Sequence, residues 1–123
     1  HRDLHVRSRR ERQMCIKDRY KNLQDGKISP SEYIIITEVT SSQVTTQISE
    51  FVTSKPSEKW QEIYISYRNG MKKFNEYIIE TKVLANQIEN ESAETKISET
   101  VNKIEAIKLE SIEHIKKSNE LRP

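Results

Sequence analysis

The feature that most constrains this chain is a run of mostly apolar side chains whose spacing alternates between four and three residues. The run consists of Trp60, Tyr64, Tyr67, Met71, Phe74, Ile78, Thr81, Ala85 and Ile88. Such a heptad repeat is typical of a helix that buries one stripe against a neighbouring helix. It predicts a long helix over residues 56–95. Gly70 costs about 1 kcal/mol inside a helix, but the repeat keeps its phase from Tyr67 to Met71. We therefore predict a continuous helix, with a break at Gly70 as the alternative.

A second helix is predicted before this one, over residues 29–53. Ser29, Pro30 and Glu32 form a capping-box pattern, in which a hydroxyl caps the first turn and proline takes the first helical position. The β-branched run at 33–37 leaves a strand as the alternative there. Residues 20–28, which contain Asp25-Gly26, are predicted to be a turn. The helix over 29–53 would bury a stripe close to the helical period: Tyr33, Ile36, Thr40, Val44, Ile48 and Phe51.

A third apolar stripe follows the polar stretch 86–95 and is out of phase with the heptad run. Either the helix over 56–95 continues through a stutter, or a third helix covers 96–119. Because the connection at 53–56 is short, the first two helices should be antiparallel neighbours. The sequence predicts an all-α fold of two or three long helices, an antiparallel hairpin with coiled-coil-like packing. The third stripe comprises Ile97, Val101, Ile104, Lys108 through its aliphatic stem, Ile112 and Ile115.

Residues 1–19 differ in composition from the rest of the chain. They hold six arginines and one lysine, whereas residues 20–123 hold two arginines and twelve lysines. The segment resembles a conceptual translation of a sequencing-library adapter. One end of that oligonucleotide encodes His-Arg-Asp-Leu-His, as in residues 1–5, and most of residues 9–18 match the remainder, with Glu11 and Lys17 as the differences. The resemblance implies that residues 1–19 are non-native, and a disordered basic arm is the alternative.

The charge balance depends on this segment. The whole chain carries 21 basic and 19 acidic side chains. Seven of the basic and three of the acidic ones lie in residues 1–19, so residues 20–123 carry 14 and 16, a net charge of −2. A negative net charge gives no support to a nucleic-acid partner. We expect residues 20–123 to be a fragment of a bacterial or phage protein, either cytoplasmic or secreted by a leaderless route.

The sequence offers no catalytic or cofactor-binding constellation. Its one cysteine, Cys15, and two of its three histidines lie in residues 1–19, which leaves His114 alone in a charged stretch. Metal-ligand spacing of cysteine and histidine, a glycine-rich phosphate loop and an isolated carboxylate pair are all absent. We therefore expect no enzyme activity, no cofactor, no metal and no small-molecule substrate. The sequence also has no apolar run long enough to span a membrane.

Two helix starts carry a resemblance to a known family: Ser29-Pro30-Ser31-Glu32 and, later, Trp60-Gln61-Glu62. Over residues 28–95 the chain resembles the small helical hairpins of the Trp-x-Gly family, which Gram-positive bacteria export through the type VII system. The resemblance implies a hairpin with Trp60 at its bend, acting as the partner of a larger effector. The chain departs from the family at Glu62, where the family has glycine, and in lacking a tyrosine-based export signal after the second helix.

These patterns favour a non-enzymatic helical protein–protein interaction module. The predicted partners are protein helices, from a second copy of the chain or from another protein. The alternatives are the secreted hairpin and a helical sensory or signalling segment of a membrane receptor whose spans lie outside this sequence. Part of the heptad run forms the predicted interaction seam: Trp60, Tyr64, Tyr67, Met71, Phe74, Ile78 and Ile88.

Overall fold

The computed structural model describes residues 9–53 and 56–121, with side chains from residue 16 onward except those of residues 52 and 53. Within these ranges the chain forms helices and turns and no strand, which confirms the all-α prediction. The strand alternative at 33–37 is wrong. The elements are α1 (Arg9–Gln24), α2 (Pro30–Thr53), the short 3-10 helix η2 (Glu58–Trp60), α3 (Gln61–Glu89) and α4 (Glu94–Glu120).

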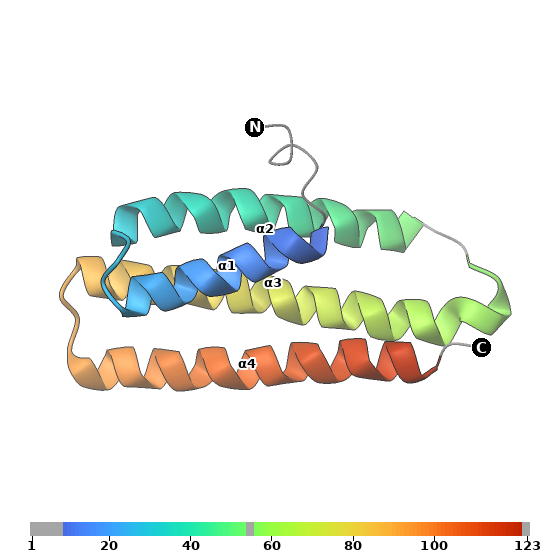
Figure 1. Ribbon diagram of the computed structural model, residues 1–123. Coiled ribbons are helices and arrows are strands. Elements are labelled where there is room, and N and C mark those ends of the chain that lie inside the picture. The colour runs from blue at the N-terminus through green and yellow to red at the C-terminus, as the bar shows by residue number, and fades with distance from the viewer. Residues whose placement is uncertain (1–8, 54–55, 122–123) are drawn as a thin grey trace.

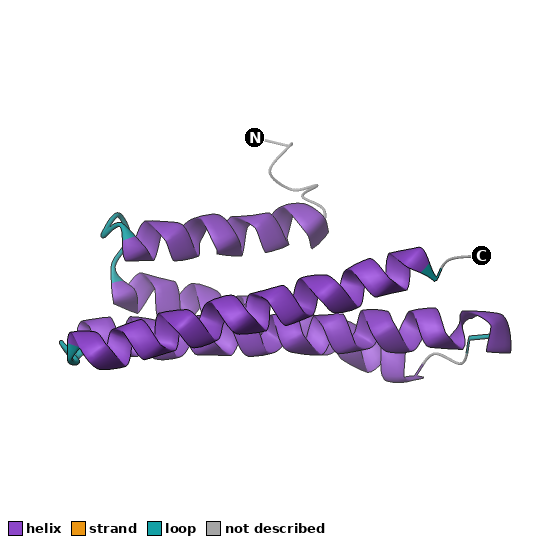
Figure 2. Ribbon diagram, turned by 90° about the horizontal axis from the view of Figure 1, so that it is seen from below, coloured by secondary structure: helices purple, strands orange, loops and turns teal. Residues whose placement is uncertain are grey.

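Helix α3 is the middle element of the structure. It packs against α2 on one side and α4 on the other, and among the described residues α2 and α4 do not approach each other. Figure 1 shows α2, α3 and α4 side by side, with the chain reversing direction at each connection. The shorter α1 crosses one face of this layer and contacts α2 and α3, and Figure 2 shows it set apart on that face.

Helix α2 begins where the capping pattern predicts. The Ser29 side-chain oxygen accepts a hydrogen bond of 3.2 Å from the backbone N–H of Glu32. That bond satisfies one of the donors that a helix N-terminus leaves free. The predicted stripe is correct in its main members: Tyr33 and Val44 are buried, and the others are partly buried.

The predicted turn over 20–28 is wrong for its first part, because α1 extends through residue 24. Tyr20 and Leu23 are buried in the core, and this burial favours helix there over turn. The helix ends in a Schellman motif: Lys27 N–H donates to Asn22 C=O and Gly26 N–H donates to Leu23 C=O. Gly26 supplies the positive φ of +74° that this motif requires.

The helix predicted over 56–95 is shorter at both ends. Its first turn is the 3-10 helix η2, and α3 itself begins at Gln61 and runs through Gly70 without a break. It ends in a second Schellman motif, in which Ser92 N–H donates to Gln87 C=O and Glu91 N–H donates to Ile88 C=O. Glu91 holds a φ of 53° there. A separate helix, α4, therefore starts at Glu94, as the third-helix alternative predicts.

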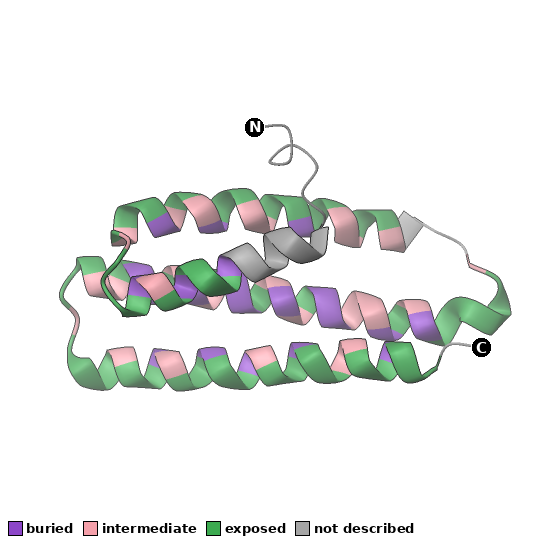
Figure 3. Cartoon of the chain, viewed as in Figure 1, coloured by how far each residue is buried: buried purple, intermediate pink, exposed green. Residues whose placement is uncertain are grey.

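The predicted stripe of α4 is correct in part, because Ile97, Val101, Lys108 and Ile115 are partly buried. Ile104 is buried as predicted, but Ile112 is 43% exposed. The buried positions of α4 that the predicted stripe does not include are Thr100, Ile107, Ser111 and Ser118. Figure 3 shows how buried residues follow α3 along nearly its whole length, since it has a neighbour on both sides.

Candidate interaction surfaces

The predicted interaction seam lies mostly inside the structure. Met71, Phe74 and Ile78 are buried, and Tyr64, Tyr67 and Ile88 are partly buried. This seam faces α2: the Phe51 ring lies 5.5 Å from that of Tyr64 and 5.1 Å from that of Tyr67. The seam therefore joins two helices of the same chain, and most of it is not free for a partner.

Trp60 is the exception in this seam. It is 39% exposed and ends η2, one residue before α3 begins. A 3-10 turn has three residues per turn instead of 3.6, so the heptad register of α3 does not extend back to Trp60. The prediction that Trp60 packs in the seam is wrong for this reason.

A second buried stripe of α3 lies outside the predicted seam, and its residues Ile63 and Gly70 contact α4. It is made partly of small residues, and all its members are buried: Ile63, Ser66, Gly70, Tyr77 and Leu84. A Cβ atom at Gly70 would lie 2.7 Å from Ile115 Cγ1 and 3.3 Å from His114 Cβ. Only glycine permits this approach of the two helices. The signal in the sequence was the small residues of α3 and α4, which a count of apolar side chains omits.

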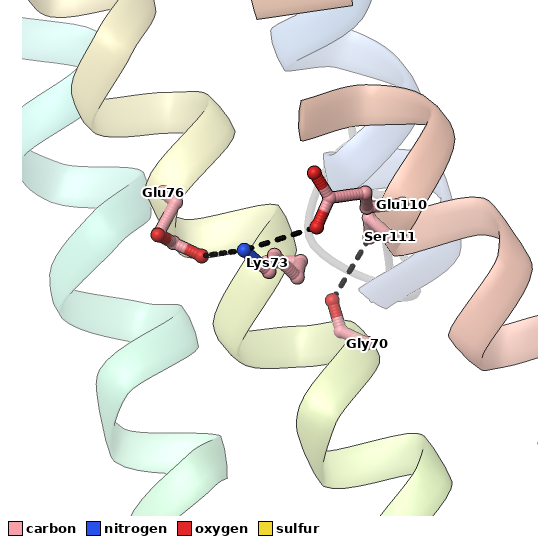
Figure 4. A network of polar contacts seen from close by, with 5 residues as sticks. All are labelled: Gly70, Lys73, Glu76, Glu110 and Ser111. Atoms are coloured by element: carbon pink, nitrogen blue, oxygen red, sulfur yellow. Dashed lines mark hydrogen bonds and ion pairs between the residues drawn. The ribbon is translucent and has the colours of Figure 1, made fainter. Parts of the chain in front are cut away.

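Two serines of α4 close this contact with hydrogen bonds. Ser111 Oγ donates to the Gly70 carbonyl at 2.9 Å (Figure 4), and Ser118 Oγ donates to the Ile63 carbonyl at 3.1 Å. Both bonds are buried and reach backbone carbonyls across the interface. Short hydroxyl side chains can make such bonds only where two helix backbones lie close together.

Ion pairs border the layer on the side shown in Figure 4. Lys73 Nζ lies 3.1 Å from Glu76 and 3.1 Å from Glu110. The hydrogen bond from Lys73 to Glu110, followed in size by the one to Glu76, raises the pKa of Lys73. Further along, Lys103 pairs with Glu80 at 3.2 Å. The Lys73–Glu110 and Lys103–Glu80 pairs link α3 to α4 near the surface, where each contributes about 0–1 kcal/mol.

Helix α1 contributes Tyr20 to a cluster of three tyrosines that also includes Tyr33 of α2 and Tyr77 of α3. The Tyr20 ring lies 6.5 Å from Tyr33 and 6.0 Å from Tyr77. The hydroxyl of Tyr20 is buried without a hydrogen-bond partner, and that of Tyr33 lies near the Thr81 side chain but makes no hydrogen bond of standard geometry. Burial raises the pKa of Tyr20 to about 12 and also raises those of Tyr33 and Tyr77. These neutral phenols form part of the core.

The side of α3 opposite Phe74 and Thr81 has no covering helix. Ile65 is 48% exposed, Ile79 46% and Val83 37%. We define the outer stripe as the six residues of this side that repeat the spacing of four and three: Ile65, Asn69, Lys72, Glu76, Ile79 and Val83. A shallow depression of about 310 Å³ between α2 and α3 adjoins it, lined in part by Glu38, Ile79 and Lys82.

A smaller apolar patch lies on α2. Ile35 and Val39 are exposed beside a depression of about 260 Å³ that Ile16 and Arg19 of α1 also line. This patch spans little more than one helical turn, whereas the outer stripe extends over five. The outer stripe is therefore longer than the apolar patch on α2.

Other kinds of site are not found in the part of the chain that the structure describes. No group of three or more His, Cys, Asp or Glu residues there is arranged to hold a metal ion. None of the described helices combines the length and apolar character needed to cross a membrane. Comparisons with protein-family models, curated proteins and solved structures gave no match for this chain.

Proposed function

We propose that this chain is a non-enzymatic helical protein–protein interaction module whose binding surface is the outer stripe of α3. The observation that supports this most strongly is the exposure of Ile65, Ile79 and Val83 along one uncovered side of the middle helix. Large apolar side chains that share one helix face and remain exposed are typical of interaction sites. Burying one such side chain fully is worth about 1.5–3 kcal/mol. Because these side chains are already about half buried, a partner that covered them would gain roughly half of that free energy.

The spacing of the outer stripe supports a helix as the partner. Positions that alternate by four and three residues accept the side chains of another helix as knobs into holes, in a coiled-coil-like contact. Ion pairs lie on both flanks of the stripe, Lys73 with Glu110 towards α4 and Lys82 with Glu38 towards α2. The outer stripe has exposed apolar residues towards both ends, Ile65 at one and Ile79 and Val83 at the other, with the charged Lys72 and Glu76 between them.

Photocrosslinking tests this function. A photoreactive amino acid replaces Ile79 in the full chain, which is expressed in bacterial cells, irradiated and analysed for covalent adducts. The matched control carries the same group at Leu109, which is 62% exposed on α4. We expect protein adducts from position 79 and few from position 109. Equal yields from both positions, or no adduct from position 79, would contradict the proposed function.

The secreted hairpin is a second candidate. Trp60 lies in the turn between α2 and α3, which is the place that the Trp-x-Gly resemblance implies, and α2 starts with the capped Ser29-Pro30 pair. Its test is export from a Gram-positive host with and without the type VII machinery. Release into the medium that requires the machinery and is lost in Trp60→Ala would support it, and retention in the wild-type strain would exclude it.

A further inference from the structure

We infer that the partner of the outer stripe is a second copy of this chain, bound antiparallel so that α3 packs against α3 across a two-fold axis. The inference rests on the proposed function and names the partner. In a two-fold arrangement the same patch is used twice, so the patch must be complementary to itself when reversed. The outer stripe meets this condition when the two-fold axis crosses the helix pair at the level of residue 74, which is midway between Ile65 and Val83.

The charges of the stripe are complementary in this register. Residues equally far from position 74 face each other, so Lys72 of one copy faces Glu76 of the other, and the symmetry makes this pair twice. Lys72 is exposed and has no hydrogen bond or ion pair within the described residues. Glu76 is half-exposed, and its ion-pair partner among the described residues is the partly buried Lys73. Both side chains are thus accessible to a second copy.

The apolar residues match in part in the antiparallel register, in which Ile79 of one copy faces Asn69 of the other. Ile65 of one copy faces Val83 of the other, which places exposed apolar side chains together at both ends of the contact. A parallel pair would instead place Lys72 opposite Lys72 and Glu76 opposite Glu76. Like charges at facing positions are unfavourable, so the stripe selects the antiparallel orientation.

The size of the contact limits its strength. The stripe from Ile65 to Val83 is roughly 27 Å long at 1.5 Å per residue. One helix pair of this length buries less than the roughly 800 Å² per partner of a standard stable interface. We therefore expect a reversible dimer that dissociates in the micromolar range.

Sedimentation equilibrium of the purified full chain is the first test. We expect a monomer–dimer equilibrium for the wild type and a monomer for Ile79→Asp at the same concentrations. The matched control is Leu109→Asp, which places the same charge on an exposed α4 position and should still dimerise. Thermal unfolding followed by circular dichroism checks that both variants remain folded. A wild type that is monomeric up to submillimolar concentration, or equal dissociation in both variants, would overturn the inference.

A charge swap tests the orientation. Lys72→Glu and Glu76→Lys each turn two facing ion pairs into like-charge pairs, so each should weaken the dimer about 10-fold. The double variant restores opposite charges at both pairs and should return to within about threefold of the wild type. Single variants without effect, or a double variant that remains as weak as the single ones, would contradict the antiparallel register.

The two sets of experiments separate the two proposals. A monomeric wild type whose position 79 crosslinks to a different protein would end the second-copy inference and leave the proposed function standing. A monomeric wild type that gives no adduct from position 79 would end both. Adducts between two copies of the chain, together with the charge-swap result, would support both.

Discussion

The contacts that α4 and α1 make with the rest of the structure are built in opposite ways. At the α3–α4 contact, Gly70 and small hydroxyl residues bring two backbones together, and Ser111 and Ser118 bond to carbonyls across the interface. Helix α1 instead places Tyr20 against Tyr33 and Tyr77, with two hydroxyls that make no hydrogen bond of standard geometry.

The difference indicates which contact holds the structure together more firmly. Each buried hydroxyl without a partner costs about 1–3 kcal/mol, whereas a satisfied buried hydrogen bond contributes about 1 kcal/mol. Aromatic burial stabilises α1, but part of that gain is lost to the unpaired hydroxyls. The α3–α4 contact has no such loss at Ser111 and Ser118, and it extends along almost the whole of both helices.

The largest expected effect comes from removing core volume in α4. Ile104 is fully buried, so Ile104→Ala should lower the free energy of unfolding by about 2–5 kcal/mol. Ile112, on the same helix but 43% exposed, is the matched control, and Ile112→Ala should cost less than about 1 kcal/mol. Urea unfolding of both variants measures the difference. Equal losses would mean that α4 buries the face predicted from sequence.

Alkaline pH should act on the tyrosine cluster. An unfolded tyrosine ionises near pH 10, whereas burial raises the pKa of Tyr20 to about 12 and raises those of Tyr33 and Tyr77 as well. Above pH 10 the folded chain therefore holds more protons than the unfolded chain. The stability present below pH 10 is then lost as the pH rises through the folded pKa values.

Urea unfolding at pH 8 and pH 11 measures this loss, and Tyr33→Phe should reduce it by removing one of the three groups. If Tyr33→Phe leaves the loss between pH 8 and pH 11 unchanged, the ionisation of this tyrosine is not its cause.

Gly70→Ala should destabilise the α3–α4 contact. The added Cβ would lie 2.7 Å from Ile115 Cγ1, so the helices must separate or Ile115 must move. We expect a net loss of about 1–2 kcal/mol, because overpacking outweighs the roughly 1 kcal/mol that alanine gains over glycine in a helix. Asn69→Ala, one residue earlier, is the control and should be neutral or slightly stabilising. A more stable Gly70→Ala variant would show that the approach is not close.

Removing one hydroxyl group from each contact should distinguish the α3–α4 contact from the tyrosine cluster directly. Ser111→Ala removes the hydrogen bond to the Gly70 carbonyl and should cost about 1 kcal/mol. Tyr33→Phe removes a buried hydroxyl that makes no hydrogen bond of standard geometry, so near neutral pH it should be neutral or stabilising by up to about 1 kcal/mol. Chemical denaturation at pH 7 compares them. A larger loss for Tyr33→Phe than for Ser111→Ala would reverse the comparison.

The smallest expected effect is at the end of α3. Glu91 has a φ of 53°, a conformation that glycine adopts without the strain of a Cβ atom. Glu91→Gly should therefore stabilise the chain by a few tenths of a kcal/mol, up to about 1 kcal/mol. Differential scanning calorimetry can detect the small rise in Tm. A fall in Tm would indicate that Glu91 makes a contact worth more than its backbone strain.

Periodicity and capping predicted the helices well where they agreed. Ser29 caps α2 as predicted, and the heptad run from Tyr64 to Ile88 lies on one continuous helix. The errors have two physical sources. The 3-10 turn before α3 takes Trp60 out of the heptad register, and the spacing of apolar residues cannot reveal such a turn. Tyr20 and Leu23 continue α1 because of burial by distant helices, which no local pattern encodes.

The candidate surface was harder to predict than the fold. Hydrophobicity indicated which α3 residues are able to bind a helix, but not which of them a neighbour in the same chain already covers. The second buried stripe of α3 contains Ser66 and Gly70, whose role depends on closeness to Ser111 and Ile115. The outer stripe is left without a covering helix, and its mixed apolar and charged residues look like an ordinary solvated face in the sequence.

Native-state hydrogen exchange of the full chain tests the contrast between the two contacts most directly. We expect backbone amides of α3 and α4 around Gly70 and Ser111 to exchange only with global unfolding. Amides of α1 around Tyr20 should exchange through a local opening of lower free energy. Equal opening free energies for α1 and the α3–α4 contact, or lower ones for α4 than for α1, would contradict this order of stability.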